Sequence, residues 1–185
     1  NYWRCLFENL TVSTDGANSV MARSVLHFKN NSKTAQPGVI SVKNIFGSRK
    51  ANWCVFFSVT KGSLPEFDDY LIENLYSGRL GAIKDDGRVH LKSSKIERIF
   101  GGIELSTLIH VCIDGVYLEP LRQQEAYGVK AKYAFNCSIS NVKIYYGSFD
   151  DDLQKIGTLP VLRCVSLATG HYNKVERCTL YVHNT

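Results

Sequence analysis

Residues 63–78 constrain the fold more than any other stretch, because they carry the start, face and stop signals of a helix. Ser63 can cap the helix, Glu66 completes a capping box, and Pro65 falls in the first turn, where its missing N–H costs little. Gly78 ends the pattern at the C′ position. Apolar side chains follow helical spacing at Phe67, Tyr70, Leu71 and Leu75. The sequence therefore predicts one helix over about 63–78, which another element must cover because so short a helix is marginal alone.

The remainder of the chain is predicted to form about ten strands joined by short turns. Residues 53–60 form the most central strand, with Trp53, Val55, Phe57 and Val59 on one side. The Asp-Asp-Gly of residues 85–87 separates two short apolar segments and predicts a hairpin. Residues 93–102 fit a strand or a helical turn, and the Asp-Gly of residues 114–115 marks a bulge or a tight turn. Short turns favour antiparallel pairing, so we expect an α+β, mostly β fold in which a twisted antiparallel sheet packs around the helix.

Length and charge exclude several classes of protein. The 185 residues show no internal repeat, linker or low-complexity tract, which predicts a single domain over 1–185. No apolar run reaches membrane-spanning length, and the start does not resemble a signal peptide, although Asn at position 1 is compatible with a processed chain. The net charge of +5 is spread along the sequence, which favours an ordinary solvated surface over a nucleic-acid footprint.

The six cysteines do not form metal-binding or redox motifs. Cys5, Cys54, Cys112, Cys137, Cys164 and Cys178 are too far apart in sequence for a Cys-x-x-Cys pair. Several lie in apolar strand-like runs, so reduced thiols are favoured over a full disulfide framework, which stays open. We expect no metal and no cofactor. Glycosylation sequons at Asn9, Asn30 and Asn136 can arise by chance and do not establish secretion.

The sequence lacks the common catalytic motifs, including the serine-nucleophile elbow, the His-Glu-x-x-His pair, the phosphate loop and the dinucleotide fingerprint. His110 lies in an apolar run and fits a hydrogen-bonded core residue better than a base. The three aspartates of 150–152 fit a solvated turn better than a calcium loop. Ten tyrosines and nine phenylalanines supply large contact faces, which suit glycan and protein recognition equally.

Short motifs occur in a characteristic order along the first two thirds of the chain. They are Tyr2-Trp3, Thr14-Asp15-Gly16, Trp53 with Phe56-Phe57, Lys61-Gly62-Ser63, Phe67, Arg79-Leu80-Gly81 with Lys84, Gly87-Arg88-Val89, Ile109-His110, Tyr117, Pro120 and Gln124-Glu125. In this order they resemble the trypsin-released head fragment of the rotavirus outer-capsid spike protein. In the group A members of that family, a tryptophan-led Phe-Phe strand runs into Lys-Gly-Ser, and a Gly-Arg-Val hairpin follows. Residues from Val129 onward have no counterpart in this resemblance.

The resemblance implies a non-enzymatic attachment domain on the virion surface, made in the host cell. Its partners would be a host cell-surface glycan or protein receptor and the remainder of the spike protein, with no nucleic acid and no membrane insertion. It makes a galectin-like β-sandwich the second choice of fold. By position it suggests Asp85, Arg88, His90 and Arg49 as ligand-binding residues. Asp85 replaces a tyrosine that helps to hold sialic acid, and its carboxylate would repel a carboxylated sugar.

Two other functions stay open at this point. The chain fits a structural virion or capsid-type β domain that mediates assembly, which predicts an exposed apolar patch. It also fits a small hydrolase with a Cys/His site assembled in space, which predicts a deep pocket around a perturbed thiol.

Overall fold

The computed structural model describes residues 3–11, 22–34, 38–47, 51–76, 80–119, 125–147 and 161–183. Within these ranges every regular element is a β-strand. The same ranges contain no helix that is long and apolar enough to cross a membrane.

The strands form two sheets. Sheet A contains β1 (Trp3–Thr11), β3 (Gly38–Phe46), β6 (Tyr70–Tyr76), β9 (Lys95–Phe100), β11 (Cys112–Leu118), β13 (Ser138–Gly147), β15 (Lys174–Glu176) and β16 (Thr179–His183). Sheet B contains β2 (Ala22–Asn30), β4 (Ala51–Val59), β5 (Glu66–Asp68), β7 (Gly81–Asp85), β8 (His90–Lys92), β10 (Ile103–Ile109), β12 (Glu125–Phe135) and β14 (Val161–His171). Every described pairing between neighbouring strands is parallel.

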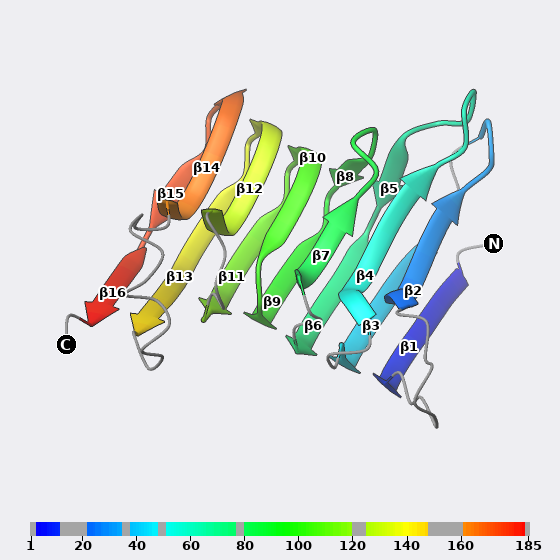
Figure 1. Cartoon of the computed structure of the whole chain (residues 1–185). Helices are drawn as coiled ribbons and strands as arrows, with labels where there is room; N and C mark the ends of the chain where they lie inside the picture. The colour runs from blue at the N-terminus through cyan, green and yellow to red at the C-terminus, as the bar shows by residue number, and fades with distance from the viewer. Residues whose placement is uncertain are drawn as a thin grey trace.

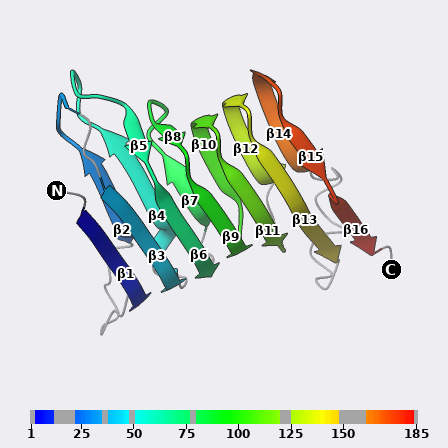
Figure 2. The same ribbon diagram turned by 180° about the vertical axis from the view of Figure 1, so that it is seen from behind.

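The chain alternates between the two sheets and winds into a parallel β-solenoid. Each coil adds one rung to sheet B and then one to sheet A, so β1 lies at one end of the stack and β16 at the other (Figure 1). The view from behind shows the sheet A strands side by side in chain order (Figure 2). Because the chain always re-enters a sheet from the same side, parallel pairing follows from the winding itself.

The hydrophobic core fills the space between the sheets. Fully buried side chains from sheet A include Val42, Ile45, Leu75, Ile96, Ile99, Ile113, Val116, Ile139 and Val142, and those from sheet B include Val55, Phe57, Ile83, Ile103, Leu108 and Val129. Each contributes about 1.5–3 kcal/mol relative to an exposed position. The strand predicted over 53–60 is confirmed by β4, although β4 lies next to β2 at the end of sheet B and not at its centre. Val55, Phe57 and Val59 enter the core as predicted, but Cys54 enters it as well, and Trp53 is buried outside this core cluster.

The predicted helix over 63–78 is wrong, since β5 and β6 occupy most of that stretch. The buried residues of β5 and β6 are Phe67, Tyr70, Ile72 and Leu75. A strand normally buries every second residue. Here Asp69 and Asn74 take left-handed φ values of 58° and 54°, and each adds one residue to the alternation. The buried side chains are therefore spaced by three, two and three residues, which imitates the face of a helix.

The expected antiparallel sheet is also wrong. The Asp-Asp-Gly of residues 85–87 does not reverse the chain, because β7 before it and β8 after it both pair in parallel with β10. It forms a turn that interrupts a single rung of sheet B. The second choice, a galectin-like β-sandwich, shares two facing sheets with the structure, but the described strands show none of its antiparallel pairing. Residues 93–102 contribute β9, with no helical turn.

Sheet A contains an internal repeat that the sequence analysis missed. In each rung of this sheet, one residue has no partner in the register with the neighbouring strands, and that residue has a left-handed φ. The members of this left-handed column are Asn9, Asn44, Asn74, Arg98, Gly115, Asn141 and Arg177. Asn44 Nδ2 donates to Asn9 Oδ1 at 3.1 Å, and Asn74 Nδ2 donates to Asn44 Oδ1 at 3.0 Å. Gly115 shows that the Asp-Gly of β11 is a bulge and not a tight turn.

Sheet B bends at a second column of skipped positions. The registers pass over Ser106 in β10, Lys132 in β12 and Ala168 in β14. In the β7–β8 rung the turn over residues 85–89 lies at the same place, because Lys84 pairs with Glu104 and His90 pairs with Thr107. This bend explains why an Asp-Gly turn can occur inside a rung without ending it.

Candidate functional site

The outer face of sheet A carries a row of stacked aromatic rings. Phe46, Tyr76, Phe100 and Tyr117 occupy one register position on successive strands. Successive ring centroids are 4.7, 4.8 and 5.4 Å apart, with interplanar angles of 5°, 2° and 23°. Because these rings lie face to face along the solenoid axis, the faces within the row cover one another. The row therefore presents mainly ring edges to solvent.

A second stack begins two residues further along the strands. Tyr145 of β13 stacks on Tyr181 of β16 at 4.6 Å and 3°. Since Leu118 pairs with Ile144, the residue next in register to Tyr145 is Glu119, which directly follows β11. Among the described residues no ring stacks on the face of Tyr145 turned toward β11, and Glu119 lines the same groove as this face.

A groove of about 440 Å³ lies between the two stacks. Its lining consists of Tyr76, Phe100, Gly101, Tyr117, Leu118, Glu119 and Tyr145. These residues come from the neighbouring ends of β6, β9, β11 and β13, which lie side by side in Figure 2. We call this surface the tyrosine groove. It combines an apolar aromatic wall with the carboxylate of Glu119, which can accept hydrogen bonds.

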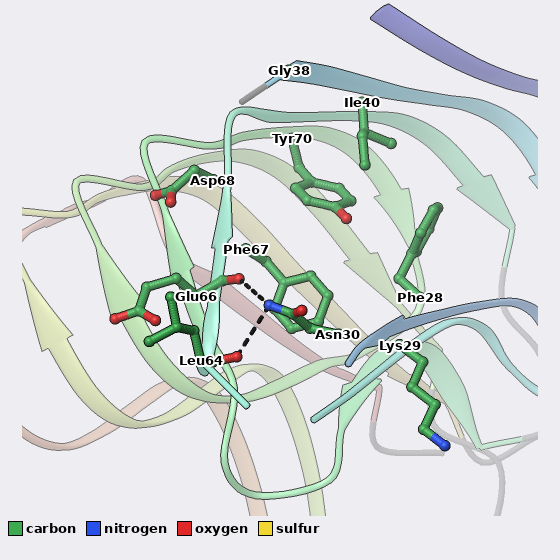
Figure 3. A pocket seen from close by; sticks show the side chains of 10 residues that line it. All are labelled: Phe28, Lys29, Asn30, Gly38, Ile40, Leu64, Glu66, Phe67, Asp68 and Tyr70. Atoms are coloured by element: carbon green, nitrogen blue, oxygen red, sulfur yellow. Dashed lines mark hydrogen bonds between the residues drawn. The ribbon is translucent and has the colours of Figure 1, made fainter. Parts of the chain in front are cut away.

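A smaller cleft of about 200 Å³ lies where β2 and β5 approach the starts of β3 and β6 (Figure 3). The Asn30 amide donates to the carbonyl oxygens of Leu64 at 3.1 Å and of Glu66 at 3.3 Å. Burial raises the pKa of Tyr70 and also that of Asp68. Glu66 Oε1 is 3.4 Å from Lys92 Nζ, whereas the buried Glu66 Oε2 has no partner. Through these two hydrogen bonds Asn30 holds the loop before β5 against the end of β2, so the cleft chiefly has a structural role.

Three of the site residues suggested by the resemblance, Asp85, Arg88 and His90, lie in the β7–β8 rung of sheet B and do not line the tyrosine groove. Asp85 is only 7% exposed, and its carboxylate accepts the backbone N–H of Ser106 at 2.6 Å and that of Gly87 at 2.8 Å. Burial raises the pKa of Asp85, although the hydrogen bonds from Ser106 and Gly87 oppose the rise. The structure thus shows a bend-stabilising role for Asp85, and its ligand-binding role stays a prediction.

The structure describes two of the other three suggested residues. Arg88 lies on the exposed turn and forms an ion pair with Asp86 at 2.7 Å. His90 opens β8 and is partly buried. Arg49 lies outside the described residues. The structure therefore brings Arg88 and His90 into the same rung without showing a shared binding surface.

The sequence analysis missed the tyrosine groove, although a tripeptide signal was present. In four coils the residue of the left-handed column is followed by an aliphatic core residue and then by an aromatic residue. The pattern reads Asn-Ile-Phe at 44–46, Asn-Leu-Tyr at 74–76, Arg-Ile-Phe at 98–100 and Gly-Val-Tyr at 115–117. The first residue varies because asparagine, glycine and here arginine all take left-handed φ, and this variation hides the repeat.

The described residues contain no group of three or more metal-ligating side chains. The closest approach to a catalytic pair is His27 Nε2 and Ser58 Oγ, 2.7 Å apart on the outer face of sheet B. Burial and then the nearby cation of Arg23 lower the pKa of His27, which favours a neutral imidazole. A hydrogen-bonded Ser–His pair without an identified oxyanion site or substrate pocket does not define an active site.

No family model, curated protein or solved structure matches this chain. Proposals about its function accordingly depend on the geometry and on the residues themselves.

Proposed function

We propose that this domain is a non-enzymatic recognition domain that binds a carbohydrate in the tyrosine groove. The observation that carries the proposal is the open face of Tyr145 beside Glu119, in a groove of about 440 Å³. The groove has the size of a small-ligand site.

The chemistry of the groove matches that of a sugar ring. A pyranose has an apolar face of C–H groups and a rim of hydroxyl groups. The open Tyr145 ring can cover the apolar face, and the Glu119 carboxylate can accept hydrogen bonds from the hydroxyls. A flat apolar ligand would gain nothing from the exposed Glu119 carboxylate, which would stay hydrated. This pairing of groups supports a sugar over a purely apolar molecule.

The resemblance to the spike head supplies a wider setting for this proposal. In that setting the domain attaches a virion to a host cell-surface glycan, and the remainder of the spike protein holds it at the virion surface. A protein receptor is the alternative ligand. The position of the groove on an outer sheet face is compatible with either ligand, and only the aromatic–carboxylate pairing favours a glycan.

A glycan-array screen of the 185-residue domain, followed by titration calorimetry with the best sugar, tests the proposal. We expect Tyr145→Ala to weaken binding about tenfold, which corresponds to about 1.4 kcal/mol for a lost stacking contact. Glu119→Gln should also weaken binding, because a neutral amide accepts weaker hydrogen bonds. Tyr172→Ala is the matched control, since Tyr172 is 81% exposed at a corner between the sheets. Unchanged affinity in both groove variants would refute the proposal, and cell binding without a glycan signal would favour a protein receptor.

A second candidate function is assembly, which the last described coil favours. Val175 and Leu180 pair with the fully buried Ile139 and Ile144, yet they are 45% and 43% exposed. These side chains form an apolar surface that a second copy of the chain could cover. Sedimentation velocity over a range of concentrations measures this: self-association that Leu180→Lys abolishes would support assembly, and a monomer at every concentration would exclude it.

A further inference from the structure

The outer face of sheet B carries a second groove with a different chemistry. Its volume is about 380 Å³. The polar and charged residues of its lining are Lys84, Asp85, Glu104, Ser106, Lys130, Lys132 and Ser166. They come from β7, β10, β12 and β14, which lie next to one another in Figure 1. We call this surface the cationic groove, and we include Arg163 of β14, which does not line the groove itself but pairs with Tyr127 of β12 at its margin.

Aromatic rings hold the cations of this groove in place. Lys130 Nζ lies 4.2 Å from the centroid of the Tyr127 ring. On the next strand, Arg163 Nη1 donates to the Tyr127 hydroxyl at 2.9 Å. Lys132 Nζ lies 5.2 Å from the centroid of Tyr133. Such contacts restrict long side chains and reduce the entropy lost when they bind a ligand.

These three cations have no carboxylate partner among the described residues, unlike many others in the molecule. Ion pairs join Lys43 to Glu73, Lys84 to Glu104, Arg88 to Asp86, Lys92 to Glu66, Lys95 to Glu97, Arg98 to Glu73 and Lys174 to Glu176. Glu104 is the register neighbour of Lys130 but is paired with Lys84. Among the described residues that line the groove, Lys84, Lys130 and Lys132 face the two carboxylates Glu104 and Asp85, and the Asp85 carboxylate is already bonded to Ser106 and Gly87. The described lining therefore carries a small excess of positive charge.

We propose that the cationic groove binds an anionic substituent, a carboxylate or a sulfate, carried by an acidic polysaccharide. Lys130, Lys132 and Arg163 can neutralise the anion, and the Ser166 hydroxyl can donate to it. The inference goes beyond the proposed function, because the cationic groove lies on the other sheet and shares no residue with the tyrosine groove.

Nucleic acid fits the groove less well than an acidic sugar. Adjacent strands are about 4.8 Å apart, so cations on β12 and β14 cover one or two anionic groups and not a long phosphate track. Nucleic-acid platforms also need open aromatic faces on which bases can stack. Here Lys130 and Arg163 both lie against the Tyr127 ring.

The test is calorimetric titration of the 185-residue domain with a chondroitin sulfate hexasaccharide in 50 mM salt. We expect saturable binding that the double variant Lys130→Gln with Lys132→Gln weakens about tenfold, as for one or two charge-assisted hydrogen bonds. Arg163→Gln should weaken it by a smaller factor. The charge-matched control is Lys33→Gln with Lys61→Gln, since both lysines are exposed and lie outside this groove. The control should change affinity less than twofold.

Three outcomes would overturn the inference: no binding at 50 mM salt, an equal loss in the groove variant and the control, or equally tight binding of a single-stranded oligonucleotide. A dextran hexasaccharide should not bind this groove because it carries no anionic group. Tyr145→Ala should leave chondroitin sulfate binding unchanged, so failure here and failure of the tyrosine groove can be told apart. Thermal unfolding of each variant checks that it is folded.

Discussion

Two aspartates stand at bends in the two sheets of the solenoid, and the pKa values of their carboxyl groups shift in opposite directions. Asp85 lies at the bend of sheet B and is 7% exposed, whereas Asp114 precedes the bulge of sheet A and is only partly buried. Burial raises the pKa of Asp85. Hydrogen bonds from Ser140 Oγ and Asn141 Nδ2, each at 2.6 Å, lower the pKa of Asp114.

The comparison shows that burial, and not the number of hydrogen bonds, decides the sign of the shift. Both carboxylates accept several hydrogen bonds from neighbouring coils or turns. Asp85 loses its hydration almost completely, so the charged form is disfavoured despite its partners. Asp114 keeps contact with water, so its partners stabilise the charged form without a large desolvation cost. A solenoid bend can therefore be held by either kind of carboxylate, with opposite dependence on pH.

The largest expected effect is that of Asp85→Ala. The change leaves the buried Ser106 N–H and hydroxyl and the more exposed Gly87 N–H without this acceptor, and we expect it to lower the free energy of unfolding by about 3 kcal/mol. Urea denaturation at pH 7 measures the loss. Asp85→Asn keeps an acceptor and should lose less. A loss below that of Asp114→Ala would show that Ser106 and Gly87 find other acceptors.

Asp114→Ala should have a smaller effect, of about 1 kcal/mol, because its donors Ser140 and Asn141 can reach water when the carboxylate is removed. The same denaturation assay measures it, with Ser140→Ala as a companion that removes one of the two hydrogen bonds. If Asp114→Ala proves as damaging as Asp85→Ala, partial exposure does not protect the sheet A bend.

The pH dependence of the two asparagine variants should have opposite signs. Asp114 has a folded pKa below its usual value of 3.8, so its stabilisation is present above that pH and is lost as pH falls. Asp85 has a folded pKa above 3.8, so its ionisation destabilises the fold as pH rises through that value. Between pH 3 and pH 7, Asp85→Asn should gain stability relative to wild type, whereas Asp114→Asn should lose it. Urea denaturation at each pH measures both trends, and parallel curves would contradict the assignment.

The smallest expected effect is that of Asn74→Gly in the left-handed column. Glycine adopts the φ of 54° more easily, but the variant loses the side-chain bonds to Asn44 and from Arg98, the latter at 2.8 Å. These opposing terms should leave a net change of about 0.5 kcal/mol. Asn74→Ala has neither the conformational freedom of glycine nor the side-chain hydrogen bonds of asparagine. Its free energy of unfolding should be about 1 kcal/mol lower than that of Asn74→Gly, since a non-glycine residue at positive φ is strained. Equal stability of the two variants would mean that this strain is relieved locally.

Local strand positions were predictable, but their pairing was not. Residues 53–60 show a strand pattern in sequence, and β4 confirms it. The period of two is the same in parallel and antiparallel sheets, so alternation alone cannot fix the direction of pairing. The false helix over 63–78 arose because Asp69 and Asn74 lengthen the spacing of buried residues in β5 and β6.

The repeat escaped detection because the coils differ in length. Successive members of the left-handed column are separated by 17 residues between Arg98 and Gly115 but by 36 between Asn141 and Arg177. Only the short pattern of a left-handed column residue followed by a core residue recurs in each coil, and a search at one fixed period cannot find it. The tyrosine groove escaped for a related reason, since Tyr117 and Tyr145 become neighbours only when β11 and β13 are stacked.

The sequence by itself determined that this protein is rich in strands and that Val55, Phe57 and Val59 of β4 enter a core, because alternation and side-chain volume are local properties. Only the tertiary structure decided that the strands pair in parallel, that the Asp-Asp-Gly turn interrupts a rung, and that two grooves of different chemistry lie on the two outer faces. The physical reason is that each groove is built across strands from different coils. Its chemistry therefore depends on the register between coils, which the winding of the whole chain sets.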